Sequence, residues 1–586
     1  MPTIALRKST IPMKGETLLP ALLEARGVTD PDEMELRQKL IPYTSFKGIR
    51  QAALTLAQAI IKKEKIVVVA DYDCDGATAC AIAVSGLAAL GADIDFVVPN
   101  RMIHGYGLTP AVVAVAKEKD PRWILTVDNG IASVEGVAAA NALDIGVVIT
   151  DHHLPGDRLP DAQAIVNPNQ PGCPFPSKNV AGCGVMFYVF FATRDALRAT
   201  APKEIAQEAA EVDVAQWLDL VALGTVADVV KLDANNRWLV DKGLQRIRAG
   251  LTRPGVGALF HVARCDYEWA KSQDFGFQLG PRLNAAGRLS DMTIGIRCLL
   301  ENDPDKAEEM ARELHQLNEQ RKDIEKGMKE TAWAKIEVEQ QKGQFTRVVF
   351  GKDFHEGVIG IVAGRVKELE FVPTVVFAGT EDGSWKGSGR SVPGCHLRDA
   401  LDAIYKKHPK WFAKFGGHAM AAGLTLTAEG AAGFAQEFEA EVKKWFNGKL
   451  PKQTIMADGW LDNSDLNLDT AILMTQQVWG QGFEEPLWLG RFEVIDANIV
   501  GKEKNHLRIL LKHEHGDEKL TAMHFFQEDG TIPRQGDIIE LAYRLSHSQF
   551  NGEREMTLIV AERSGSGGKL PIVELKEQPE SAAVPA

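Results

Sequence analysis

Four acidic motifs recur in the first 230 residues, and each follows a short apolar run. Aspartates 71, 73 and 75 share one loop after residues 66–70, and Asp128 follows residues 123–127. Asp151-His152-His153 follows residues 145–150, and Asp228 ends the segment 224–228. Carboxylates and imidazoles are ligands for divalent cations, and a pair of such cations can hydrolyse phosphate esters. The motifs therefore predict a two-metal site for phosphoester cleavage.

The elements that must position these residues alternate between β-branched runs and alanine-rich segments from about residue 60 to residue 230. The segments 77–90 and 132–143 have helical periodicity, which predicts repeated βαβ units around a parallel sheet. Ligands of such sheets bind outside the carboxyl ends of the strands. We therefore expect all four motifs, Asp228 included, at one edge of the sheet.

Each motif taken alone has a simpler explanation. Asp75 could cap the helix that starts near Ala77, because aspartate is a favoured N-cap residue. Asp151 could be a turn residue, and His152 or His153 could be a partly buried histidine. The combination favours a metal site, because three carboxylates in one loop would repel one another without cations.

The rest of the chain suggests several further domains. A long helical pattern starts at Pro304, with Asp303 as its N-cap, and is typical of a helix that bridges two domains. A second α/β pattern follows, and then short alternating segments predict a β-barrel. The expected division is a leader at 1–50, a phosphoesterase domain at 51–300, a connecting helix at 301–342, an α/β domain at 343–450, a barrel at 451–565 and a disordered tail at 566–586.

Bulk composition narrows the class of protein. The chain has 586 residues, 45% of them hydrophobic, and no apolar run long enough to span a membrane. It has seven cysteines without a C-x-x-C pair and no secretory signal, which favours a reducing, cytoplasmic setting. The net charge of −13 argues against a nucleic-acid partner, unless bound cations neutralise the clustered carboxylates.

The acidic motifs together resemble those of the DHH phosphoesterase superfamily. Residues 416–423, Gly-Gly-His-Ala-Met-Ala-Ala-Gly, are similar to the signature of its associated C-terminal domain. Residues 280–288 and 100–108 resemble its nuclease branch, and the resemblance covers about residues 40–565. It implies an α/β fold with a parallel-sheet DHH domain, a long connecting helix, a second α/β DHH-associated domain and a C-terminal OB-like β-barrel.

The resemblance also implies a cofactor and a reaction. Two Mg²⁺ or Mn²⁺ ions per active site would be held by Asp71, Asp73, Asp75, Asp128, His152 and Asp228. His153, Asp128 and Asp75 would be catalytic. The pyrophosphatase branch has a metal-binding histidine at the position of Val69, and Asp71 is expected to serve instead. The implied activity is 5′→3′ degradation of single-stranded DNA to 5′-mononucleotides in DNA repair and recombination.

The predicted DNA or phosphate contacts are Arg101, His104, Tyr106, Arg282, Asn284, Arg288, Ser388, Arg390 and His418. Arg282 and Arg288 could instead be solvated arginines on a structural turn. The basic and aromatic stretch 405–415 suits single-stranded DNA, or an amphipathic helix with its rings in the core. Single-stranded DNA is the expected partner, and the family adds a single-strand-binding protein and a RecQ-type helicase.

Two other functions remain open. The chain could hydrolyse short oligonucleotides, cyclic dinucleotides or pyrophosphate, although the barrel and long helix favour a polymer. It could also be an inactive binding module of a replication assembly, although the acidic set is intact. Digestion of long and short substrates and a metal titration distinguish these functions.

Overall fold

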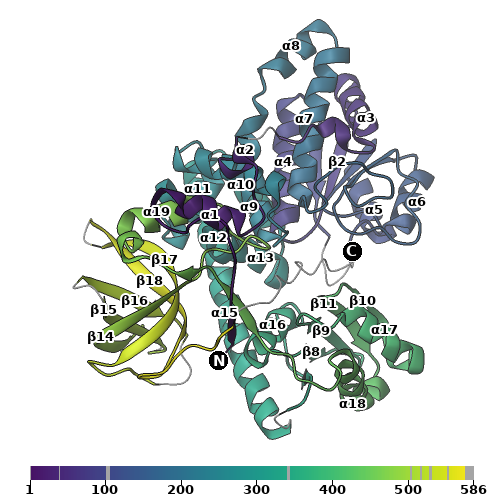
Figure 1. The fold of residues 1–586 in the computed structure, drawn as a ribbon. Helices are drawn as coiled ribbons and strands as arrows, with labels where there is room; N and C mark the ends of the chain where they lie inside the picture. Colours follow the sequence, from purple (N-terminus) through teal and green to yellow (C-terminus); the bar gives the residue numbers. More distant parts are fainter. Residues whose placement is uncertain are drawn as a thin grey trace. The chain divides into compact units, whose positions relative to one another are not determined.

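The computed structural model describes residues 2–37, 40–99, 106–339, 343–501, 504–514, 518–526, 531–550 and 553–573 (Figure 1). The chain forms two compact units. One contains Leu6–Gln316 and Met456–Leu570, and the other is built around Leu317–Ile455. Among the described residues, no helix combines the length and apolar character needed to cross a membrane.

The first unit contains a parallel five-stranded sheet in the order β3-β2-β4-β5-β6. Its strands are β2 (Ile66–Ala70), β3 (Ile94–Val97), β4 (Trp123–Val127), β5 (Gly146–Thr150) and β6 (Ala164–Val166). The central strands β2, β4 and β5 are almost wholly buried, which explains why they read as continuous apolar runs rather than alternating ones. The predicted parallel sheet is confirmed.

Helices cover this sheet. α5 (Pro110–Lys117) and α6 (Val134–Ala142) share a hydrophobic core with it, and α4 (Cys74–Ala89) packs on β2 and on α7 (Gly182–Thr200). The helices expected at 77–90 and 132–143 are thus confirmed as α4 and α6. Among the described residues in this part of the unit, the other α-helices of four or more residues are α1 (Leu18–Glu24), α2 (Pro31–Met34), α3 (Ile49–Lys62), α8 (Lys203–Glu211), α9 (Leu218–Ala227), α10 (Ala234–Arg248), α11 (Pro254–Ala263), α13 (Gly280–Leu289) and α14 (Thr293–Leu300).

The predicted long helix is α15 (Pro304–Glu339). Oδ1 of Asp303 accepts hydrogen bonds from the backbone N–H groups of Asp305 at 3.0 Å and Lys306 at 3.3 Å, so Asp303 caps the helix as expected. The boundary between the two units falls within α15. The expected end of the connecting helix, at residue 342, lies outside the described residues.

The second unit is the expected second α/β domain. Its sheet has the order β10-β11-β9-β8-β7. The strands are β7 (Arg347–Gly351), β8 (Thr374–Gly379), β9 (Trp385–Arg390), β10 (Phe412–Gly417) and β11 (Ala421–Leu426), with helices α16 (Ile359–Glu370), α17 (Leu397–Lys407) and α18 (Ala428–Trp445). β1 (Thr3–Leu6), β12 (Thr454–Ala457) and β19 (Ile572–Val573) form a separate small sheet.

The segment 405–415 is not one helix, so that alternative was wrong in its secondary structure. α17 ends at Lys407, and Pro409 begins a short turn that leads into β10. Proline has no N–H to continue a helix. The rings nevertheless lie in the core as that alternative expected, because Phe412 is buried and Trp411 and Phe415 pack against the same cluster.

The predicted β-barrel lies in the first unit. Its five strands are β14 (Trp488–Val500), β15 (His506–His513), β16 (Lys519–His524), β17 (Ile538–Phe550) and β18 (Glu553–Arg563). They pair in the order β14-β15-β16-β18-β17, and β17 returns to pair with β14. Closure removes the exposed edges of the sheet. A helix, α19 (Leu468–Gln476), packs against β17 and β18.

A buried ion pair joins the barrel segment to the N-terminal helices within the first unit. Arg26 donates two hydrogen bonds to the carboxylate of Asp458, at 2.8 and 3.0 Å, and the Asp458 side chain is fully buried. Removal of one partner leaves an uncompensated buried charge, so we expect Asp458→Ala to lower the free energy of unfolding by about 3–5 kcal/mol. Guanidinium denaturation measures this loss. Asp469→Ala, at an exposed position, is the control, and an equal loss in both variants would contradict the expectation.

Candidate metal centre

The register of the sheet places three aspartates side by side. Ala70 pairs with Val127, and Val127 pairs with Thr150. The residues that follow these three are Asp71, Asp128 and Asp151. The three carboxylates therefore lie next to one another, just beyond the carboxyl ends of the strands. The predicted convergence at the carboxyl ends of the strands is confirmed for these three motifs.

The loop after β2 brings two more carboxylates to this edge. Asp73 is the N-cap of α4, and its Oδ1 accepts a hydrogen bond from the backbone N–H of Gly76 at 3.0 Å. The suggested cap at Asp75 is therefore not the observed one. Asp75 instead accepts hydrogen bonds from the backbone N–H groups of Gly182 at 2.6 Å and Cys183 at 2.9 Å. The N-terminus of α7 thus holds the Asp75 carboxylate, an arrangement that favours an anion.

Asp228 reaches the same place from a different element than expected. It is the C-cap of helix α9 and does not follow a strand, so that part of the prediction was wrong. The segment 218–225 is buried on every side. A helix buried all round has the same continuous apolar sequence as a buried strand, and periodicity cannot distinguish them.

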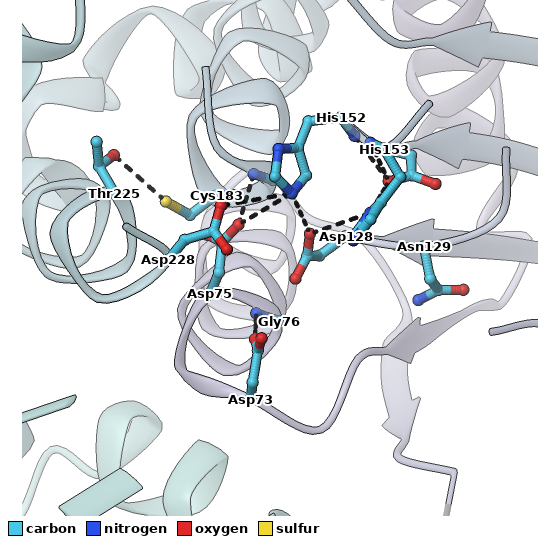
Figure 2. Close-up of polar contacts among 12 residues, drawn as sticks. Asp73, Asp75, Gly76, Asp128, Asn129, His152, His153, Cys183, Thr225 and Asp228 are labelled. Carbon is cyan, nitrogen blue, oxygen red and sulfur yellow. Dashed lines mark hydrogen bonds and ion pairs between the residues drawn. The ribbon is translucent and has the colours of Figure 1, made fainter. Parts of the chain in front are cut away.

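His152 lies at the centre of the carboxylates (Figure 2). Its Nε2 is 3.1 Å from Oδ1 of Asp128, 3.5 Å from Oδ2 of Asp228 and 4.0 Å from Oδ2 of Asp75. The possible ligand atoms form three groups, and the atoms within each group lie within 4.8 Å of one another. The groups are Asp75-His152-Asp228, Asp71-Asp73-Asp128 and Asp128-His152-His153. Asp128 belongs to two of these groups, Asp71-Asp73-Asp128 and Asp128-His152-His153, which suits a carboxylate shared between two cations.

The electrostatics of the centre fit bound cations. Burial, followed by the neighbouring carboxylates, raises the pKa values of Asp128 and Asp228 well above their usual range. Asp71 is shifted in the same direction, by burial and by Asp73. Within the part of the chain that the structure describes, Oδ1 of Asp128 and Oδ2 of Asp228 are buried and make no hydrogen bond. Buried carboxylates this close together are stabilised by a positive charge between them.

Asp151 and Tyr106 hold the second histidine from both sides. Oδ1 of Asp151 lies 2.8 Å from Nδ1 of His153, and the Tyr106 hydroxyl lies 3.1 Å from Nε2 of His153. Burial opposes the charge on His153, but Asp151 outweighs it and raises the His153 pKa to about 9. Burial likewise opposes ionisation of Asp151, yet His153 brings its pKa below the usual value. The ionised Asp151 carboxylate can only accept, so Nδ1 of His153 carries a proton.

Two features of this centre were not predicted from the sequence. Asp151 was considered as a turn residue and not as a partner of His153. The Gly182-Cys183 backbone that binds Asp75 had no assigned role, although a glycine at the start of a buried helix is a signal for close packing.

Glycine at 182 allows the close approach of α7 to Asp128. A Cβ atom there would lie 2.5 Å from Oδ1 of Asp128. We expect Gly182→Ala to displace this carboxylate and weaken Mn²⁺ binding by about 10–100-fold, as do mutations of residues that orient metal ligands. Isothermal titration calorimetry measures the affinity. Gly364→Ala, where a Cβ would meet no atom within 4 Å, is the control, and wild-type affinity in Gly182→Ala would contradict the expectation.

The other predicted site residues fall into three sets. Arg282, Asn284 and Arg288 lie on helix α13, so the suggested turn was wrong. Ser388 and Arg390 lie on β9, and His418 follows β10, all in the second unit. Arg101 and His104 lie outside the described residues. The contacts of these residues with DNA stay predictions.

Comparison with known proteins agrees with the fold and the centre. Family models match residues 65–225 (DHH family, N-terminal domain), 341–448 (DHHA1 domain) and 457–562 (RecJ OB domain). The single-stranded-DNA-specific exonuclease RecJ of Salmonella typhimurium is 44% identical, over 93% of this chain and 95% of the relative. RecJ of Escherichia coli is 42% identical, over 94% and 96%.

Solved structures give the same result. The crystal structure of RecJ in complex with Mn²⁺ from Thermus thermophilus has a TM-score of 0.75 and 28% identity, over 93% of this chain and 75% of that chain. The corresponding Mg²⁺ complex has a TM-score of 0.70 and 26% identity, over 93% and 74%. The fold and the aspartate-histidine centre define a DHH-type phosphoesterase. The chain belongs to the RecJ family of single-stranded-DNA-specific exonucleases.

Proposed function

We propose that the chain is a single-stranded-DNA-specific 5′→3′ exonuclease that releases 5′-mononucleotides by phosphodiester hydrolysis. The observation that carries the proposal is the convergence of five aspartates and His152 on one sheet edge, with their ligand atoms facing one another. Membership of the RecJ family and the presence of the OB-type barrel support a single-stranded DNA substrate.

The residues proposed to hold two Mn²⁺ or Mg²⁺ ions are Asp71, Asp73, Asp75, Asp128, His152 and Asp228. When bound, the two ions supply an activated water and neutralise the charge of the phosphodiester. Asp128 would be the ligand shared by the two ions, because it belongs to two of the three groups of ligand atoms. Asp75 stays in place because the backbone of α7 fixes both of its oxygens.

His153 is proposed to give a proton to the leaving 3′-oxygen. Asp151 orients the ring through Nδ1, and Nε2 is the nitrogen that faces Tyr106. The raised pKa keeps His153 protonated at neutral pH, as a general acid requires. Tyr106, which is 46% exposed, lies where it can contact the substrate phosphate or pass a hydrogen bond from it to His153.

The proposed DNA contacts are Arg101, His104, Tyr106, Arg282, Arg288, Ser388, Arg390 and His418, and Asn284, which the sequence also predicted as a DNA contact, is assigned a different role in the next subsection. Arginine suits phosphate because its planar fork donates two hydrogen bonds. The family also favours a cytoplasmic location, a role in DNA repair and recombination, and association with a single-strand-binding protein and a RecQ-type helicase. The domain limits given above, from the leader at 1–50 to the tail at 566–586, are part of the same proposal.

Digestion of single-stranded DNA labelled at either end tests the proposal, with Mn²⁺ or with chelator and beside a blunt duplex. We expect metal-dependent release of labelled mononucleotides from the 5′ end of the single strand, and no attack on the duplex. Cleavage of dinucleotides alone would place the protein in the small-substrate branch of the superfamily. Strand binding without any cleavage would instead support the binding module.

A further inference from the structure

Helix α13 packs against the acidic loop that contains Asp71, Asp73 and Asp75. Asn284, Gly287 and Arg288 are spaced three and four residues apart, so they lie on one face of the helix. We propose that this face is a clamp that holds the acidic loop in its metal-binding geometry, with Asn284 as the positioning residue. The inference rests on the proposed two-metal function and gives Asn284 a role other than its predicted contact with DNA.

The central contact joins Asn284 to the start of α4. Oδ1 of Asn284 accepts a hydrogen bond from the backbone N–H of Cys74 at 2.8 Å. Cys74 is the first residue of α4, and the N–H groups of a first helical turn have no partner within the helix. Asp73 already uses Oδ1 for the N–H of Gly76. Without Asn284, the Cys74 N–H would compete for a carboxylate oxygen that the metal needs.

One further contact holds the same loop. A Cβ atom at Gly287 would lie 1.9 Å from the carbonyl oxygen of Tyr72, so the α13 backbone lies directly against the loop. The clamp thus contacts Tyr72 and Cys74, the residues on either side of Asp73.

The chemistry of position 284 suits a clamp. An amide oxygen satisfies the Cys74 N–H without adding a negative charge beside Asp71, Asp73 and Asp75. The neighbouring Arg282 side chain also points to a structural role for this helix, because it is 5% exposed and donates to the carbonyl oxygen of Gln278. Oδ1 of Asn284 is bound to the backbone N–H of Cys74. We therefore expect Asn284 to control the geometry of the metal site and not the affinity for DNA.

The test compares Asn284→Ala, Asn284→Asp and the exposed control Asn302→Ala. Calorimetry measures Mn²⁺ affinity without DNA, and oligonucleotide digestion at saturating Mn²⁺ gives kcat and KM. We expect Asn284→Ala to weaken Mn²⁺ binding about tenfold or more, as do other losses of groups that orient metal ligands. Its KM for single-stranded DNA should stay at the wild-type value. Asn284→Asp keeps the acceptor, so it should bind Mn²⁺ more tightly than Asn284→Ala.

Each contrary result has a distinct meaning. Unchanged Mn²⁺ affinity in Asn284→Ala with a raised KM overturns the clamp and supports DNA contact. If Asn284→Ala fails to fold, Asn284→Asp decides, because a DNA contact predicts a raised KM from repulsion of phosphate and the clamp does not. If the wild-type protein itself binds no Mn²⁺, the proposed function fails, a result that the Asn284 variants cannot produce.

Discussion

Asp128→Asn is expected to lower kcat by about 10³-fold or more while the protein stays folded. The substitution removes the charge of the carboxylate that belongs to two of the three ligand groups. A loss of roughly 4 kcal/mol of transition-state stabilisation, which is typical of a metal ion that polarises a phosphoryl oxygen, corresponds to this factor. Single-turnover digestion of a 5′-labelled oligonucleotide at saturating Mn²⁺ measures it.

Asparagine is the right replacement because Asp128 has a left-handed backbone, with φ of 62°. Asparagine tolerates this conformation better than alanine does. Asp144→Asn is a matched control, because Asp144 also has a left-handed backbone, with φ of 58°, and an exposed side chain. Asp144 lies just before β5, at the end of the strand opposite to the metal centre. Equal activity of Asp128→Asn and Asp144→Asn would refute the metal centre.

Asp151→Asn is expected to lower kcat by about 10²–10⁴-fold with little change in Mn²⁺ affinity. Asp151 accepts hydrogen bonds from the backbone N–H groups of Ile131, His152 and His153 and faces Nδ1 of His153. An amide nitrogen in place of a carboxylate oxygen would present a donor to one of these donors. The His153 ring would then lose its orientation and its proton on Nδ1, as in other carboxylate–histidine pairs.

Separate measurement of kcat and KM distinguishes this effect from a general loss of structure. We expect kcat to fall and KM for the oligonucleotide to stay near the wild-type value, because Asp151 acts through His153. Asp157→Asn, an exposed position in the same connection, should behave as wild type. A large loss of Mn²⁺ affinity in Asp151→Asn would instead indicate that Asp151 shapes the ligand His152.

The sequence predicted most of the centre because several of its residues directly follow short, buried strands. Asp71, Asp128 and Asp151 each come directly after such a strand, and the carboxyl ends of parallel strands share one edge by geometry alone. Asp228 lies beside the other carboxylates as expected but on a different element than expected, because a fully buried helix has no polar face to reveal its period. Tertiary packing, and not the local sequence, determines that this segment is a helix.

Contacts between distant segments could not be predicted. The hydrogen bonds from Gly182 and Cys183 to Asp75 span more than 100 residues. The bond from Cys74 to Asn284 spans 210 residues. The helix α13 read as a turn because it contains Gly280, Pro281 and Gly287, which are poor helix formers in isolation. Its position against the acidic loop explains Gly287, since only a residue without Cβ fits beneath Tyr72.

The shared register of Ala70, Val127 and Thr150 has a thermodynamic consequence. Hydrogen bonds of the sheet fix the level of the two ligands Asp71 and Asp128, so the protein pays for bringing these buried acidic groups together during folding, before any cation arrives. Bound cations would offset that cost, which couples the supply of ions to the folded state. Each tenfold rise in free Mn²⁺ above its dissociation constant adds about 1.4 kcal/mol to stability. The melting temperature of the protein should therefore rise with the concentration of free Mn²⁺, as the catalytic rate does.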